Sequence, residues 1–238
     1  MILERKAQIK TSDFEQEIKG LQEKFKTDIH DEPRIYLVEF AGLMHMYSGA
    51  MKEVSTKLEV LDDEFHIRHS HNPIHHLECR IKNIKSIYEK MQRYGVPLTP
   101  DSLREHVQDI AGIRVICNFI DDIYEMEKLL LRQSDITLVK RRDYIEQPKE
   151  NGYRSLHLVV KVPVFLSDKI EDVPVEIQLR TIAMDYWASL EHMLQYKKTK
   201  SDIDTKKYAE MLLDCASTLA ATEKTMQQIR IHIEQSEQ

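Results

Sequence analysis

The order of hydrophobic patterns between residues 77 and 197 constrains the fold of this chain more than any other feature. A helical pattern over about 82–94 is ended by Gly95 and Pro97, and a second one runs over about 121–132. Four short apolar runs are typical of strands, at 114–119, 136–141, 155–162 and 173–180. The order strand, helix, strand, strand, strand predicts an α+β fold, in which helices flank one face of a mixed, mostly antiparallel sheet.

Helical patterns also lie on both sides of this region. The first 60 or so residues are expected to be helical, with a second helix from about Arg34 to Leu61, and another helix is expected over 181–197. A last helix carries apolar residues at alternating steps of four and three, at Tyr208, Leu212, Cys215, Leu219, Thr222, Met226, Ile229 and Ile233. This seam suits association with another helix and equally suits packing on its own domain. We therefore expect an N-terminal helical extension (1–62), a central domain (63–198) and a C-terminal helix (199–238).

Composition narrows the class of protein. The chain has 42% hydrophobic and 31% charged residues, typical of a globular protein, and its net charge of −6 argues against bulk nucleic-acid binding. No apolar run is long enough for a membrane span, and the amino terminus lacks the apolar core of a secretory signal. Three widely spaced cysteines favour reduced thiols, and hence a cytoplasmic location without membrane partners.

The helix over 82–94 has two chemically different faces. Its apolar side chains lie together and are expected to face the core: Ile84, Ile87, Tyr88 and Met91. On the opposite side, within roughly 80° of arc, lie Lys82, Ser86, Lys90 and Arg93. Such a row can grip a polyphosphate along its length, although a solvated basic face has the same pattern.

The segment from Lys149 to His157 is suited to an anionic ligand with a flat ring. Lys149 would meet phosphate, the Asn151-Gly152 pair allows a turn with positive φ, and the face of Tyr153 can stack on a base. An ordinary hairpin with a charged turn is the alternative.

Two carboxylates are candidates for a metal site. Asp109 lies just before or at the start of a strand, and Glu176 shares the polar face of another strand with Gln178 and Arg180. Mg²⁺ prefers one or two carboxylates together with phosphate oxygens. For Asp109 the alternatives are a helix cap or a salt bridge to Arg114, and for Glu176 the alternative is a strand face that is merely exposed to water. Neither a P-loop nor a dinucleotide-binding glycine motif is present.

Taken together, these features are those of a phosphoryl- or pyrophosphoryl-transfer enzyme, in which positioning and charge neutralisation supply most of the catalysis. The chain here resembles the small alarmone synthetases, single-domain members of the Rel/Spo family. The resemblance covers about residues 73–198. Its motifs are, in chain order, Arg80-Ile81-Lys82, Ser86 to Lys90, Asp109 to Arg114, Asp143 to Ile145, Lys149 to His157, Val175 to Arg180 and Met184 to His192.

The resemblance implies a nucleotidyltransferase-like synthetase fold and Mg²⁺-dependent transfer of the β,γ-pyrophosphate of ATP to the 3′-hydroxyl of GDP or GTP. It implies ATP-binding roles for Arg80, Lys82, Ser86, Lys90, Arg93 and Arg114, with Arg80 and Arg114 on either side of the adenine. It implies acceptor-binding roles for Arg142, Lys149, Asn151, Tyr153, His157 and Gln178. Asp109 and Glu176 would hold Mg²⁺ and, with Arg80 and Lys82, form the catalytic set, in which Glu176 would also activate the attacking hydroxyl.

The resemblance also bears on assembly and regulation. It implies a homotetramer formed through terminal helices. His30-Asp31 is read as chance, so no hydrolase activity is expected. Activation by product is expected to be weak or absent, because the stretch His75 to Cys79 departs from the family's pattern. The histidines over 66–76 are expected in a polar linker, with zinc binding as the alternative.

Two alternative functions stay open. A synthetase-like toxin would modify adenosine nucleotides or tRNA, although the acidic chain disfavours tRNA. A non-catalytic nucleotide or RNA sensor would be expected to lack the carboxylates, and both are present.

Overall fold

The fold is seen in a computed structural model that describes residues 3–5, 33–68, 71–97, 99–198 and 205–236. The predicted helix within the first 32 residues and the His30-Asp31 pair lie outside these ranges, apart from residues 3–5. The strands are β1 (Leu3–Arg5), β2 (Ile74–Ile81), β3 (Ala111–Cys117), β4 (Thr137–Asp143), β5 (Leu156–Phe165) and β6 (Ile170–Thr181). The helices are α2 (Pro33–Arg68), α3 (Ile84–Tyr94), α4 (Pro100–His106), α5 (Ile120–Leu131), α6 (Ile182–Lys198) and α7 (Thr205–Ser236).

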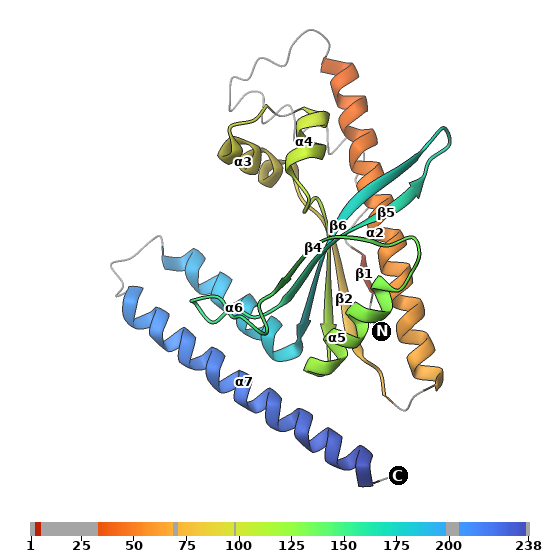
Figure 1. Ribbon diagram of the computed structural model, residues 1–238. Helices are drawn as coiled ribbons and strands as arrows, with labels where there is room; N and C mark the ends of the chain where they lie inside the picture. The colour runs from red at the N-terminus through yellow and green to blue at the C-terminus, as the bar shows by residue number, and fades with distance from the viewer. Residues whose placement is uncertain (1–2, 6–32, 69–70, 98, 199–204, 237–238) are drawn as a thin grey trace.

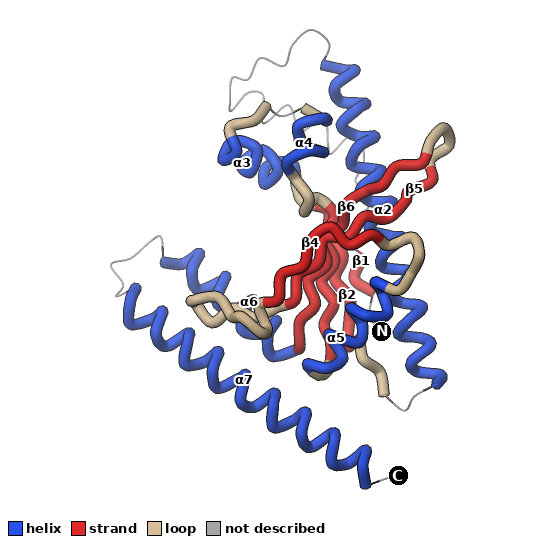
Figure 2. The backbone as a smooth tube through the Cα atoms, viewed as in Figure 1, coloured by secondary structure: helices blue, strands red, loops and turns tan. Residues whose placement is uncertain are grey.

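The strands form one six-stranded sheet in the order β1-β2-β3-β6-β5-β4 (Figure 2). Neighbouring strands run antiparallel in the pairs β2·β3, β5·β6 and β4·β5, and parallel in the pairs β1·β2 and β3·β6. The predicted α+β fold with a mixed, mostly antiparallel sheet is therefore confirmed. The last strand in sequence, β6, lies between β3 and β5.

The long helix α2 runs along one side of the sheet (Figure 1). It begins at Pro33 and continues past the boundary predicted at residue 62. Its apolar side chains, such as Phe40, Tyr47 and Leu58, are almost fully buried in the same core as the strand residues. Burial of roughly 1.5–3 kcal/mol for each large apolar side chain makes this helix an integral layer of the fold.

Local sequence signals explain where the shorter helices begin and end. The side chain of Asn83 accepts a hydrogen bond from the backbone of Ser86 and caps α3, which ends at Gly95 with a φ of 68°. Thr99 caps α4 in the same way, with Pro100 at the first helical position. The buried residues of α3 are Ile84, Ile87, Tyr88 and Met91, as predicted from their spacing.

Three elements were missed in the sequence. Strand β1 lies in a region that was expected to be helical, helix α4 was not predicted, and β2 occupies residues that were expected to belong to a polar linker and the stretch after it. His75 and His76 therefore lie on a strand, and His66 lies in α2, so the linker prediction is wrong for these residues. The predicted strand over 114–119 begins earlier, at Ala111.

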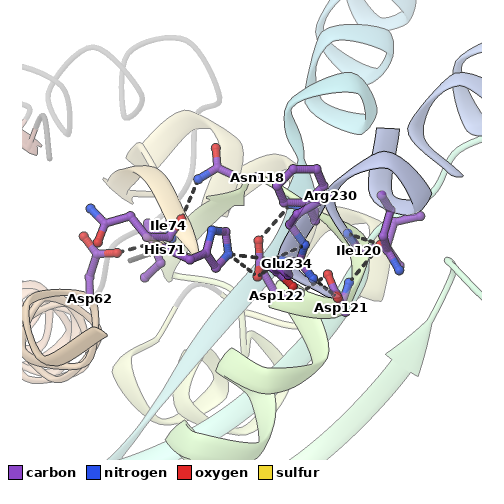
Figure 3. Close-up of polar contacts among 12 residues, drawn as sticks. Asp62, His71, Ile74, Asn118, Ile120, Asp121, Asp122, Arg230 and Glu234 are labelled. Atoms are coloured by element: carbon purple, nitrogen blue, oxygen red, sulfur yellow. Dashed lines mark hydrogen bonds and ion pairs between the residues drawn. The ribbon is translucent and has the colours of Figure 1, made fainter. Parts of the chain in front are cut away.

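The C-terminal helix α7 packs on α5 and α6 of its own chain. At its far end, Arg230 forms ion pairs with Asp121 and Asp122 at the start of α5, and Asp122 also contacts His71 at 2.7 Å (Figure 3). The guanidinium of Arg230 lies 4.6 Å from the centre of the Phe119 ring. None of the described helices is both long and apolar enough to cross a membrane.

Candidate functional site

Two rows of residues cross the polar face of the sheet at right angles to the strands. Residues that are paired on neighbouring strands share a face, so the pairing register fixes each row. The first row consists of Arg80, Gly112, Glu176, Val159 and Lys140. The second row consists of Glu78, Arg114, Gln178, His157 and Arg142. Residues predicted to bind two different nucleotides are thus brought onto one surface by the strand order.

A first cavity of about 280 Å³ lies over the β2, β3 and β6 part of these rows. It is lined by Glu78, Cys79, Arg80, Gly112, Ile113, Arg114, Glu176 and Gln178. Arg114 donates to Glu78 at 2.7 Å, which holds its guanidinium at the cavity. Both arginines that were predicted to flank adenine therefore line one cavity.

A second cavity of about 240 Å³ lies over the other half of the sheet. It is lined by Lys90, Tyr94, His106, Gln108, Asp109, Lys140, Arg142, His157, Val159 and Glu176. Five of these side chains are basic or imidazole groups and two are carboxylates, a composition suited to phosphate groups with a divalent cation. Glu176 lines both cavities, so a group in either one lies beside the same carboxylate.

Asp109 is held by two lysines at the edge of the second cavity. Lys82 Nζ lies 2.7 Å from Oδ2 of Asp109, and Lys90 Nζ lies 2.7 Å from Oδ1. Burial opposes ionisation of this carboxyl, but the hydrogen bonds and charges of the two lysines outweigh burial and hold its pKa below the usual value. Asp109 is therefore ionised at neutral pH, the form that binds a metal ion.

Glu176 is oriented by its neighbours on the sheet. Gln178 donates to Oε2 of Glu176 at 3.0 Å, and Arg180 donates to the side-chain oxygen of Gln178 at 2.8 Å. Arg180 is 5% exposed and also reaches Asp185 at 3.1 Å. Asp185 lies 3.4 Å from Arg114, so one carboxylate contacts an arginine of the first cavity and the arginine that supports Gln178.

His157 is neutral in this arrangement. Burial, together with the charges of Arg180, Lys149 and Arg142, lowers the pKa of His157 to about 3. The Tyr153 hydroxyl accepts from Arg180 at 2.6 Å and lies 2.8 Å from Nε2 of His157. Nδ1 of His157 lies 3.7 Å from Glu176. This contact is that of a polar neighbour rather than an ion pair.

The 149–157 segment forms a compact turn before β5. The backbone of Gly152 donates to Lys149 at 2.8 Å, and Gly152 has a φ of 88°, as the sequence predicted for the Asn-Gly pair. Lys149 Nζ lies 4.7 Å from the ring centres of both Tyr144 and Tyr153. Asn151 accepts from the backbone of Tyr153 and donates to Glu191 of α6, so it shapes the turn and ties it to that helix.

Most of the predicted site residues line the two cavities, but six do not: Lys82, Ser86, Arg93, Lys149, Asn151 and Tyr153. Ser86 and Arg93 line neither cavity; the backbone of Ser86 binds the cap of α3, and Arg93 is exposed. Lys82 precedes α3 instead of lying within it, yet it still meets Lys90 at Asp109.

Several residues of the site were not assigned roles from the sequence. They are Glu78, Tyr94, His106, Gln108, Lys140, Arg180 and Asp185. Lys140 lies in a basic run with Arg141 and Arg142, and Arg180 follows the polar alternation of its strand. His106 and Gln108 depend on α4 and the stretch after it, for which the hydrophobic pattern gave no signal.

Residues 79–201 match the model of a region found in RelA and SpoT proteins, which is more than half of the chain. The chain belongs to the RelA/SpoT family. GTP pyrophosphokinase YwaC of Bacillus subtilis is 44% identical over 167 residues, which cover 70% of this chain and 80% of YwaC. The predicted resemblance is thereby confirmed.

Solved structures of small alarmone synthetases share the fold. Small alarmone synthetase 2 from B. subtilis has a TM-score of 0.71 at 40% identity, covering 79% of this chain and 97% of its own. Small alarmone synthetase 1 from the same organism, solved with its product pppGpp bound, has a TM-score of 0.73 at 36% identity, covering 82% and 97%.

Proposed function

We infer that this protein is a (p)ppGpp synthetase, a GTP diphosphokinase that transfers the β,γ-pyrophosphate of ATP to the 3′-hydroxyl of GDP or GTP and releases AMP. The observation that carries the proposal is the pair of cavities that share Glu176. A transfer between two nucleotides needs two binding places that meet at one reacting group, and this sheet face provides them. Membership of the RelA/SpoT family supports the same reaction.

The donor nucleotide is assigned to the first cavity. Arg80 and Arg114 flank adenine there, because planar guanidinium groups stack on flat rings. Lys82 and Lys90 bind the triphosphate, which extends past Gly112 toward Asp109. Ser86 and Arg93 were also predicted to bind the ATP phosphates. Because they lie outside the two cavities, they would contact the end of the triphosphate that is farthest from adenine.

The acceptor nucleotide is assigned to the second cavity and the 149–157 segment. Arg142, Lys149 and His157 face its phosphates, and Tyr153 offers a ring for guanine. Since Lys149 now lies over the Tyr153 ring, guanine binding would displace its ammonium toward the acceptor phosphates. Gln178 and Asn151 serve by holding Glu176 and the turn in place.

Asp109 and Glu176 fit Mg²⁺, because both line one cavity and two carboxylates with phosphate oxygens form a ligand set that this ion prefers. Among the described residues, no group of three or more His, Cys, Asp or Glu side chains is arranged to hold a metal ion, so phosphate and water would complete the set. Bound Mg²⁺ would neutralise charge on the transferred pyrophosphate. Lys82 and Lys90 would then turn from Asp109 to the phosphates.

Glu176 is the proposed base. It accepts the proton of the 3′-hydroxyl as that oxygen bonds to the β-phosphorus of ATP, while the bond from this phosphorus to the α–β bridging oxygen breaks and AMP leaves. Gln178 keeps Glu176 oriented through a hydrogen bond to Oε2. Neutral His157 adds no positive charge that would weaken Glu176 as a base.

A label-transfer assay tests the function. Purified protein is mixed with Mg²⁺ and γ-labelled ATP, and separately with GDP, GTP, ADP or bulk tRNA. Label is expected in guanosine tetra- or pentaphosphate, and it should disappear with Asp109→Gly and with Glu176→Gln. Unchanged turnover of Glu176→Gln would exclude the base role.

The other outcomes decide between the alternatives. Label found only in adenosine products or tRNA would move the protein to the toxin class, and nucleotide binding without transfer would make it a sensor. Either result would overturn the proposed synthetase.

Assembly into a homotetramer through α7 completes the proposal. One side of this helix exposes a stripe of Tyr208, Met211, Cys215, Met226, Ile229 and Ile233, which lie within roughly 60° of arc. Exposed apolar stripes of this kind are suited to a second helix. The cytoplasm is the proposed location, because ATP and guanine nucleotides are available there.

A further inference from the structure

The middle of α7 lies directly against the 149–157 segment. A Cβ atom added to Gly152 would lie 2.7 Å from Cβ of Ala216 and 3.2 Å from Cδ1 of Leu213. The turn can therefore approach the helix only because residue 152 has no side chain and residue 216 has a small one. Ala216 is 8% exposed, so the approach is closed to solvent.

A partly buried glutamate of α7 reinforces this contact. Glu223 accepts from Arg154 at 3.2 Å and from the hydroxyl of Thr181 at the end of β6. The side chains of Arg154 and Glu223 are 16% and 11% exposed. A charge-assisted hydrogen bond in such surroundings is stronger than an ion pair on the surface. If one partner is removed, the desolvation cost of the other charged group is no longer offset by the hydrogen bond.

Tyr153 rests on a small apolar cluster made by α6 and α7. The cluster contains Trp187 and Ala188 from α6 and Ala216 from α7, with Leu212 and Leu219 packed against it. The indole nitrogen of Trp187 donates to the backbone oxygen of Leu212 at 2.9 Å, which fixes the spacing of the two helices. The position of the Tyr153 ring therefore depends on where α7 lies.

The same helix is anchored independently at α5. Gln227 accepts from the backbone of Ile120 at 3.1 Å, and Arg230 pairs with Asp121 and Asp122 (Figure 3). This second anchor means that loss of the contacts at the 149–157 segment need not release α7. The two anchor points can be tested separately.

We propose that α7 is a positioning element for the acceptor nucleotide: Glu223, Ala216 and the Leu212–Leu219 surface hold the 149–157 segment in the shape that binds the acceptor. This inference rests on the proposed assignment of that segment to GDP or GTP. Glu223 bonds to Arg154 and Thr181, and neither residue lines the first cavity, so we expect its main effect on the acceptor.

The test compares Glu223→Ala and Ala216→Leu with the unaltered protein. Initial rates are measured against GDP at saturating ATP and against ATP at saturating GDP. We expect the KM for GDP to rise about tenfold, equivalent to ~1.4 kcal/mol, with less than about a twofold change in the KM for ATP. Glu223→Gln, which keeps a hydrogen-bonding group, should recover part of the loss.

Gln227→Ala is the matched control, because it weakens α7 at α5 and leaves the 149–157 contacts in place. Amide hydrogen exchange of residues 149–157 should become faster in Glu223→Ala and Ala216→Leu but not in Gln227→Ala. Unchanged KM for GDP and unchanged exchange in both variants would overturn the inference. Equal increases in the KM values for GDP and ATP would do so as well.

The hydrogen-exchange comparison also separates this inference from the proposed function. If the unaltered protein makes no labelled guanosine product, the synthetase assignment fails, while the exchange of the segment still decides whether α7 holds it. If Glu223→Ala does not fold, Ala216→Leu carries the test without loss of a charge.

Discussion

Gly112 shows how a single residue can set the size of a cavity. It lies between Arg80 and Glu176 in the first row and lines the first cavity. A Cβ atom there would meet Cγ of Arg80 at 3.6 Å, an ordinary contact. The backbone thus accepts alanine, whereas a branched side chain would occupy space in the cavity that we propose for the donor nucleotide.

Gly112→Val should therefore raise the KM for ATP by roughly 10- to 100-fold, since one or two misplaced methyl groups in a binding pocket cost that much. The KM for GDP should change little, because the second cavity does not include Gly112. Steady-state kinetics with Gly112→Ala as the control measures this. Equal KM values for ATP in the two variants would contradict the pocket assignment.

Residue types could be predicted from the sequence more readily than residue partners. The spacing of Ile84, Ile87 and Met91 predicts the buried face of α3, because helical periodicity is local. The meeting of Lys82 and Lys90 at Asp109 is not local. It requires β2 to pair with β3, including the bond from the Lys82 backbone to Ile110 at 2.8 Å, and no local pattern specifies that pairing.

At the level of elements, β2 shows why a strand can escape prediction. Its pairing register shifts between Ile74 and His76, so the inward side chains Ile74 and Leu77 are three residues apart instead of two. The alternation of apolar and polar residues is therefore interrupted at that point. His75 and His76 weaken it further, because neither is an apolar residue. Helix α4 did carry signals, a Thr99 cap and Pro100, but only Leu103 of this short helix is buried, too few for a periodic pattern.

Helix α7 combines the two packing modes that its sequence left open. Leu212 and Leu219 of the predicted seam are half-buried against the chain itself, whereas Tyr208, Met226 and Ile229 are exposed. One stripe of the helix thus packs on its own chain, and the neighbouring stripe faces outward. A heptad pattern alone does not distinguish the inner stripe from the outer one.

The contact between Glu223 of α7 and Thr181 of β6 should also affect how the stability of the fold depends on pH. Burial raises the pKa of Glu223 more than the Thr181 hydrogen bond and the Arg154 charge lower it. The folded chain therefore keeps this proton to a higher pH than the unfolded chain does. The contribution of Glu223 to the free energy of unfolding falls as the pH rises from 4.5 through the raised pKa.

Chemical unfolding between pH 4.5 and 7.5 measures this effect. The free energy of unfolding of the unaltered protein, relative to Glu223→Gln, should decline as the pH rises. Glu210→Gln, which replaces an exposed glutamate of the same helix, is the control. A difference between the unaltered protein and Glu223→Gln that is constant with pH would refute the expectation.

For the whole molecule, the exposed stripe of α7 predicts concentration-dependent assembly. Ile229→Asp places a charge at a residue that is 48% exposed in the single chain and would be buried in the tetramer. We expect light scattering to give a lower molar mass for this variant than for the unaltered protein. Lys224→Asp, away from the stripe, should keep the mass of the unaltered protein. A single-chain mass for the unaltered protein at micromolar concentration would dismiss the tetramer.

The overall class of fold could be predicted because local hydrophobic patterns indicate which segments are helices and which are strands. The spatial order of the strands in the sheet could not be predicted. Nothing in residues 170–181 indicates that they lie between β3 and β5 instead of at an edge. That choice depends on which faces can be covered at once by α2 and α5, a property of the assembled sheet. The two cavities therefore follow from the topology and not from any single motif.

The central place of β6 has a consequence for how the chain is made. Synthesis proceeds from the amino end, so β2 and β3 emerge early, β4 and β5 follow, and the strand that joins these pairs comes after them. Until then β3 and β5 both have an unpaired edge, a state prone to slow folding and misassembly. A nascent chain that ends at β5 would hold most contacts for both nucleotides yet lack the carboxylate between them. The carboxylate at the centre of the site would thus be supplied late in translation, when residues 170–181 close the sheet.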